Sequence, residues 1–192
     1  MGEIKKHLPV KLVCALLFKE EETLKRTKTL LMRHFGSIDF ESAQLLFTYT
    51  SYYEKEFGKS LLRQFISFHR LIPPQELSRI KIITSAIEQK CAPQKRRCVN
   101  IDPGYIELSK FVLASTKDYA HRIYLGKGIF AEITLLYQDK TFKPWAWTYP
   151  DYRTPAYITV LNTIRQLYAQ QMEPAQAKTR GSLGGMPKRP KL

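Results

Sequence analysis

The run Val10-Lys-Leu-Val-Cys-Ala-Leu-Leu-Phe18 and the helical pattern that follows it decide the fold of this chain. The run is apolar but too short to cross a bilayer, and it predicts a strand buried in a protein core. Residues 20–35 then place Leu24, Leu31 and Phe35 on one face, with acidic residues in the first turn and Gly36 after the last. This pattern predicts an amphipathic helix after the strand.

The alternation of strand and helix continues to about residue 116. Aromatic-rich runs predict strands over residues 45–50 and 62–68, and prolines at positions 73, 74 and 93 mark the two ends of a second helix. A further strand region is expected over residues 97–116, with a turn at Asp102-Pro-Gly104. The order βαββαβ predicts an α+β protein with a ferredoxin-like core.

The C-terminal half extends this core. Gly126-Lys-Gly128 predicts a hairpin loop, and a second turn over residues 138–140 predicts an antiparallel β-meander. Thr154-Pro155 is typical of a helix start, with Thr as N-cap and Pro in the first turn. We therefore expect a single domain over residues 1–172 and a disordered basic tail over residues 173–192, where Pro, Gly, Ala and Ser accumulate.

The chain is strongly basic. Its 192 residues include 31 Lys and Arg against 17 Asp and Glu, a formal net charge of +14. The tail contributes about +4 of this, so the body is basic by itself. An excess of this size favours an anionic partner, such as a nucleotide, a phosphorylated metabolite, RNA or an acidic protein.

The N-terminus and the cysteines indicate a cytoplasmic protein. Pro9 and Lys11 interrupt the first apolar run, and no small-residue cleavage site follows it, so we expect neither a secretory signal nor a membrane segment. Cys14, Cys91 and Cys98 are odd in number and favour reduced thiols. The spacing of the last two does not suit a zinc knuckle, and we expect no metal.

The common nucleotide and hydrolase motifs are absent from the sequence. Gly58-Lys-Ser60 resembles the end of a P-loop, but Tyr53 stands where that loop needs its first glycine. No GxGxxG, HExxH, GxSxG or paired CxxC string occurs either. The candidate site residues are therefore taken from clusters of charged, polar and aromatic residues rather than from a known motif.

The first cluster surrounds the expected glycine turn. Arg97, Asn100 and Asp102 could recognise a phosphate or a sugar there, or Asp102 could simply be a turn residue. Lys110 shares strand parity with apolar neighbours, so it either projects among them as a functional lysine or lies after a break in the strand.

The second cluster is at the hairpin. A three-residue loop would set Arg122 directly across from Glu132, where the two form either a cross-strand ion pair or part of a catalytic site. In the catalytic alternative Glu132 is a metal ligand or general base, and Lys117, His121 and Arg122 hold an anionic substrate.

The third cluster precedes the last helix. Trp147, Tyr149 and Tyr152 could stack on a base or a sugar, with Arg153 and the helix amides near a phosphate. The same aromatic residues could instead plug the space beneath the helix.

Several strings resemble an uncharacterised prokaryotic family, the domain-of-unknown-function (DUF) family 4416. They are Tyr52-Tyr-Glu-Lys-Glu56, Phe65-Ile-Ser-Phe68, Asn100-Ile-Asp-Pro-Gly-Tyr105, Leu113-Ala-Ser-Thr-Lys117, His121-Arg-Ile-Tyr-Leu-Gly-Lys-Gly128 and Trp147-Thr-Tyr-Pro-Asp-Tyr-Arg153. The resemblance covers roughly residues 9–170 and implies a small prokaryotic cytoplasmic protein without an established activity. Members are sometimes labelled GTP-binding, but Thr116-Lys-Asp-Tyr119 matches the guanine-reading pattern only in part.

We therefore expect a site in the C-terminal half for a small anionic ligand, either a nucleotide such as GTP or a phosphorylated metabolite. Asp102, His121 and Glu132 are the candidates for catalysis if the protein is an enzyme. An RNA-binding module is the first alternative, because basic α+β domains with aromatic strands recur in RNA recognition. An adaptor for an acidic protein partner is the second.

Overall fold

The computed structural model describes residues 3–4, 6–49, 60–92 and 97–182. Their elements follow the predicted alternation of strands and helices, with the sharpest agreement at α1, which ends before Gly36 as expected. In chain order the elements are β1 (Lys11–Phe18), α1 (Glu21–Phe35), β2 (Ile38–Glu41), β3 (Leu45–Phe47), β4 (Leu61–Phe68), η1 (Pro74–Glu76), α3 (Leu77–Lys90), β5 (Val99–Ile106), β6 (Lys110–Ser115), β7 (Ile123–Gly126), β8 (Ile129–Gln138), β9 (Thr141–Pro144), η3 (Asp151–Arg153) and α4 (Pro155–Ser182).

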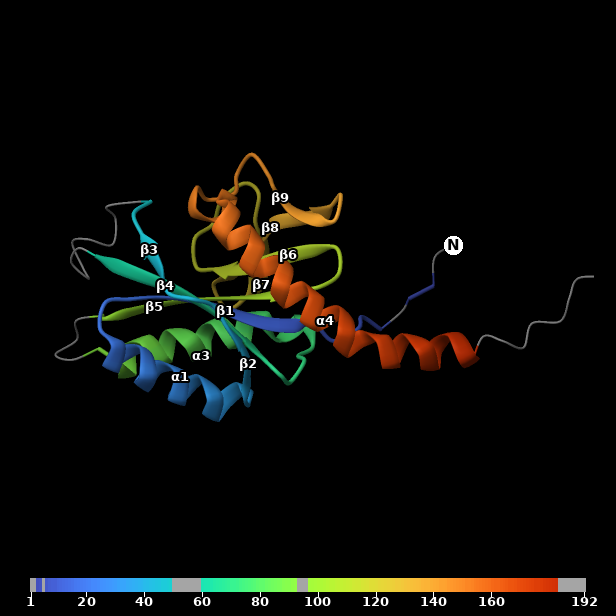
Figure 1. The fold of residues 1–192 in the computed structure, drawn as a ribbon, viewed down its shortest axis with the longest axis horizontal. Helices are drawn as coiled ribbons and strands as arrows, with labels where there is room; N and C mark the ends of the chain where they lie inside the picture. The colour runs from blue at the N-terminus through green and yellow to red at the C-terminus, as the bar shows by residue number, and fades with distance from the viewer. Residues whose placement is uncertain (1–2, 5, 50–59, 93–96, 183–192) are drawn as a thin grey trace, which may run out of the picture.

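The described strands form one nine-stranded antiparallel sheet (Figure 1). Its order is β2-β4-β1-β5-β6-β8-β7, with β3 also paired to β4 and β9 also paired to β8. β1 lies between β4 and β5, and each of its eight residues is buried. The first apolar run of the sequence is thus the central strand of the N-terminal half of the sheet.

Helices cover both faces of the sheet. Leu12, Leu16 and Phe18 of β1 pack against α1 and α3 on one face, and Val13 and Ala15 pack against α4 on the other. Figure 1 shows α1 and α3 together below the sheet and α4 crossing on the opposite side. Alternate residues of one strand therefore serve two separate cores.

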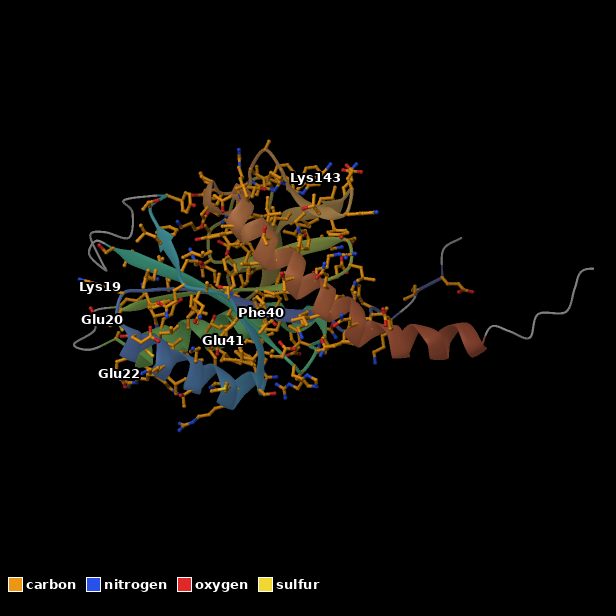
Figure 2. The ribbon with its side chains drawn as sticks, in the orientation of Figure 1. Lys19, Glu20, Glu22, Phe40, Glu41 and Lys143 are labelled. Atoms are coloured by element: carbon orange, nitrogen blue, oxygen red, sulfur yellow. The ribbon has the colours of Figure 1, made fainter. Side chains whose placement is uncertain are left out.

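Acidic residues mark the start of α1. Glu20 and Glu22 lie at that end of the helix in Figure 2, at the lower left, where they complement the positive end of the helix dipole. Lys28 of α1 donates a 2.7 Å hydrogen bond to Glu41 of β2. The sequence did not predict β2, whose residues alternate between half-buried and exposed.

The turn predicted at Asp102-Pro-Gly104 is wrong. β5 runs through these residues to Ile106, and the chain turns at residues 107–109 instead. Gly104 allows β5 and β6 to lie close together, because a Cβ atom there would lie 2.4 Å from the carbonyl oxygen of Val112 on β6. Lys110 therefore starts a new strand and pairs with Glu107 across the turn, rather than projecting into the core.

The two predicted C-terminal hairpins form, because β8 pairs with β7 and with β9, but the strands are not arranged as a simple meander. β8 lies between β6 and β7, and β9 pairs with the same edge of β8 as β7 does, farther along the strand. The β7–β8 turn is also shorter than predicted. Gly126 pairs with Ile129, and the two turn residues Lys127 and Gly128 have φ values of 56° and 74°.

The last helix begins where the sequence predicts. α4 starts at Pro155, and Thr154 Oγ1 accepts a 3.4 Å hydrogen bond from the backbone N–H of Tyr157. The helix continues to Ser182, so the predicted tail begins inside it, and the rest of that prediction, residues 183–192, lies outside the described residues. Within the described part of the chain, no helix combines the length and the apolar character needed to span a membrane.

Candidate functional site

A cavity of about 650 Å³ lies where β5 and β6 part, within the common range for ligand pockets. The two strands pair only from Gly104 to Ile106 on β5 and from Phe111 to Leu113 on β6. Beyond Leu113, β6 continues along β8, while β5 continues along β1. The split between the strands leaves room for side chains from α3, β3, β4 and the segment before α4 to converge.

Two side chains of α3 form hydrogen bonds to the backbone of β5 where β6 no longer pairs with it. Lys81 Nζ donates a 2.9 Å hydrogen bond to the carbonyl oxygen of Ile101, and Glu88 Oε1 accepts a 2.6 Å hydrogen bond from the Ile101 N–H. Burial raises the pKa of Glu88, although Lys81 opposes the shift. Glu88 also pairs with Arg97 at 3.5 Å, and Arg97 donates a 3.3 Å hydrogen bond to Asn100.

A buried arginine forms the floor of the cavity. The Arg63 side chain is only 2% exposed, and its guanidinium lies 2.9 Å from Asp102 Oδ2 and 3.5 Å from Asp151 Oδ2. Burial alone would raise the pKa of Asp102, but Arg63 and Lys81 outweigh it and hold that pKa below its usual value. Burial dominates at Asp151 and raises its pKa. The two carboxyl groups that share Arg63 are therefore shifted in opposite directions.

Tyr152 completes this floor. The residue is 3% exposed, and its hydroxyl has no hydrogen-bond partner among the residues that the structure describes. Its ring is fixed against Phe65, Phe111 and Tyr157 at centroid distances of 5.6 to 6.0 Å. Burial raises the pKa of Tyr152 well above its usual value, so the group remains a neutral hydroxyl.

The opposite wall is a network centred on Arg122. Arg122 donates to Glu132 Oε2, to Ser115 Oγ and to Tyr149 Oη at 2.7 to 2.9 Å, which confirms the predicted pair between Arg122 and Glu132. His121 Nε2 lies 3.1 Å from the same Glu132 oxygen, and Thr134 donates to the other oxygen at 3.3 Å. Both oxygens of Glu132 thus have protein partners, which a substrate would have to displace before Glu132 could act as a base.

Other predicted site residues lie outside the cavity lining. Trp147 is stacked between Trp145 and His121, at 5.0 and 5.5 Å, and its indole N–H donates to the Ile133 carbonyl. Arg153 donates to the carbonyl oxygens of Thr148 and Ala146 and so shapes the segment before α4. The structure does not bring Lys110 to the cavity either.

The structure brings most of the predicted site residues to one cavity and adds several that the sequence argument missed. The predicted residues that line it are Arg97, Asn100, Asp102, Lys117, Arg122, Glu132, Tyr149 and Tyr152. The missed residues include Phe47, Arg63, Lys81 and Glu88. A signal was present for Arg63, because it is the one charged residue of a mostly apolar strand, and for Lys81, because it lies four residues after the core residue Leu77 on the buried face of α3.

The sheet, its helices and this cavity define an antiparallel α+β protein with a pocket of mixed charge between two diverging strands. The sequence model of the family described as Domain of unknown function (DUF4416) matches residues 8–168, and the chain belongs to this family. No curated protein and no solved structure was found to match the chain.

Proposed function

We propose that the protein binds a small anionic ligand, a nucleotide or a phosphorylated metabolite, in the cavity between β5 and β6. The observation that carries this proposal is the convergence of five basic side chains on one cavity, against four acidic ones. The basic residues are Arg63, Lys81, Arg97, Lys117 and Arg122. Such convergence in a concave site favours an anionic ligand, and the net charge of +14 favours its approach.

The basic groups differ in their capacity to contact a ligand. Arg122 already donates to side-chain and backbone acceptors around it. Lys81 is buried, donates to the Ile101 carbonyl oxygen and interacts with the carboxyl groups of Asp102 and Glu88. Lys117 is exposed at the cavity's edge. Lys117 and Arg97, which has 30% of its side chain exposed, are therefore the cations that we expect to meet the anionic group.

Aromatic side chains supply a second element of recognition. Phe47, Tyr49 and Tyr149 line the cavity, and the two tyrosines are each 40% exposed. Flat rings at the edge of a pocket can stack on a nucleobase or on the face of a sugar. This combination of cations and aromatic walls supports a nucleotide, including GTP, over inorganic phosphate.

Calorimetric titration of the full chain with nucleotides and sugar phosphates tests the proposal. Lys117→Gln is expected to weaken binding several-fold, because it removes a charge from the cavity. Lys143→Gln is the matched control, since it makes the same change on β9, at the top of Figure 2 and outside the cavity lining. Equal effects of the two variants, or no binding by the wild-type protein, would count against the cavity as the site.

We also propose a ferredoxin-like core and a cytoplasmic location for this protein. The order β2-β4-β1-β5, with α1 and α3 on one face, supports a ferredoxin-like core. The cysteines Cys14, Cys91 and Cys98 are free thiols in the structure, which supports a cytoplasmic location.

RNA is the second candidate ligand because of one surface feature. Trp145, Trp147 and His121 form a column of stacked rings, and both tryptophans are 38% exposed. Exposed aromatic rings on a basic protein suit single-stranded RNA. RNA affinity that falls with salt and is lost in Trp145→Ala, but not in Lys117→Gln, would favour this candidate over the cavity ligand.

A further inference from the structure

The two ends of the cavity differ in charge. Its floor, made of Arg63, Asp102, Asp151 and Tyr152, sets one guanidinium against two carboxyl groups. Asp102 remains partly accessible, with 25% of its side chain exposed, and its lowered pKa keeps it ionised. A phosphate placed on this floor would lie against the carboxylate of Asp102, and Arg63 and Lys81 already interact with that carboxylate.

The floor also holds a buried group that lacks a partner. The Tyr152 hydroxyl is buried, and no hydrogen-bond partner for it occurs within the described parts of the chain. A buried hydroxyl without a partner costs about 1 to 3 kcal/mol, and a native structure rarely leaves one unexplained. A polar ligand atom that reached the floor would satisfy it.

The outer end of the cavity has the opposite character. Arg97 pairs with the buried Glu88 at 3.5 Å but has 30% of its side chain exposed, and Lys117 belongs to the exposed segment that follows β6. Both line the same cavity as the floor residues. A phosphate at this end meets positive charge and keeps contact with water, which lowers the cost of removing it from solvent.

We infer that the cavity takes a phosphate ester with its phosphate outermost and a body bearing hydroxyl or amino groups directed at the floor. This inference rests on the proposed function and adds the class and the orientation of the ligand. Asp102 and Asp151 accept hydrogen bonds from the hydroxyl or amino groups of the body, and Tyr152 bonds a polar atom of it. The ligand class is that of ribonucleotides and sugar phosphates, and an anion without such a body leaves the floor unsatisfied.

Isothermal titration of the full chain tests this orientation with the ribonucleoside monophosphates, ribose 5-phosphate and inorganic phosphate as probes. Tyr152→Phe removes only the hydroxyl, and we expect it to raise the Kd of the tightest ester about fivefold while leaving the Kd of inorganic phosphate within about twofold. Lys117→Gln should weaken both probes. Asp151→Asn provides a second floor variant, and it should weaken the ester without weakening inorganic phosphate.

The possible outcomes distinguish the orientation of the ligand from the proposed anion-binding function. Equal weakening of ester and inorganic phosphate by the floor variants, or no weakening of the ester, would overturn the orientation while leaving the cavity as an anion site. Failure of every probe to bind the wild-type protein would overturn the proposed function and this inference with it.

Discussion

Replacing Arg63 by methionine removes a cation that contacts both carboxyl groups on the cavity floor. Arg63 has 2% of its side chain exposed, and its guanidinium lies 2.9 Å from Asp102 and 3.5 Å from Asp151. Methionine fills a similar volume but leaves the two carboxyl groups without this partner. Breaking a buried ion pair from one side typically costs about 3 to 5 kcal/mol. For a protein of this size, that corresponds to a fall of about 6 to 20 °C in Tm.

Urea unfolding near neutral pH measures this loss, and the pH dependence identifies its cause. Arg63 helps to hold the pKa of Asp102 below its usual value, so the wild-type protein gains stability from this group above pH 3.8 and loses it as the pH falls through the lowered pKa. The variant lacks this gain. The gap in unfolding free energy between the two proteins should therefore narrow as the solution is acidified.

Two further variants sharpen the test. Arg63→Lys keeps a charge and should lose less stability than Arg63→Met. Adding Asp102→Asn to Arg63→Met removes a carboxylate that has lost its Arg63 partner, and it should recover part of the lost unfolding free energy. A loss below about 1 kcal/mol, within the range of an exposed ion pair, would refute the reasoning, as would a double variant that is no more stable than the single one.

Three other predictions follow from particular contacts. Gly104→Ala should cost about 1 to 3 kcal/mol in urea unfolding, because its Cβ atom would approach the Val112 carbonyl oxygen to 2.4 Å. Burial raises the pKa of Glu88 above 4.5, so the folded state loses stability as the pH rises and this carboxyl group ionises. Urea unfolding at several pH values should therefore show Glu88→Gln gaining stability relative to the wild-type protein as the pH is raised. Lys110→Ala should change the unfolding free energy by no more than about 1 kcal/mol, because the pair with Glu107 is partly solvated.

Local sequence patterns predicted the helices well. The apolar spacing of α1, the proline pair before α3 and the Thr154 cap of α4 are all local signals, and each helix begins close to where they place it. The Arg122–Glu132 pair was also predicted, although from a three-residue loop; the shorter turn keeps the pair because the register shifts between Tyr124 and Gly126.

Long-range strand pairing was not predictable in the same way. Asp102-Pro-Gly104 has the composition of a turn, yet these residues are held in a strand by pairing with β1. Gly104 serves the close approach of β6, a requirement that no local pattern reveals. The order of β6, β8 and β7 likewise depends on pairings between distant segments.

The sequence predicted only part of the candidate site, because the site also contains residues from distant segments that meet in the fold. Tyr149, Tyr152 and the residues near Arg97 form a polar and aromatic concentration that is visible in the sequence. Arg63 and Lys81 reach the cavity from β4 and α3, so their role becomes apparent only when the split between β5 and β6 brings distant elements together.

Amide chemical-shift mapping of the full chain during titration with a ribonucleoside monophosphate tests the central claim most directly. Binding in the cavity predicts that the largest shifts fall on residues 100–102, 115–117 and 149–152, from three separate parts of the chain that line it together. Saturable shifts that instead cluster around Trp145 and Tyr119, or no shifts at any attainable concentration, would contradict it.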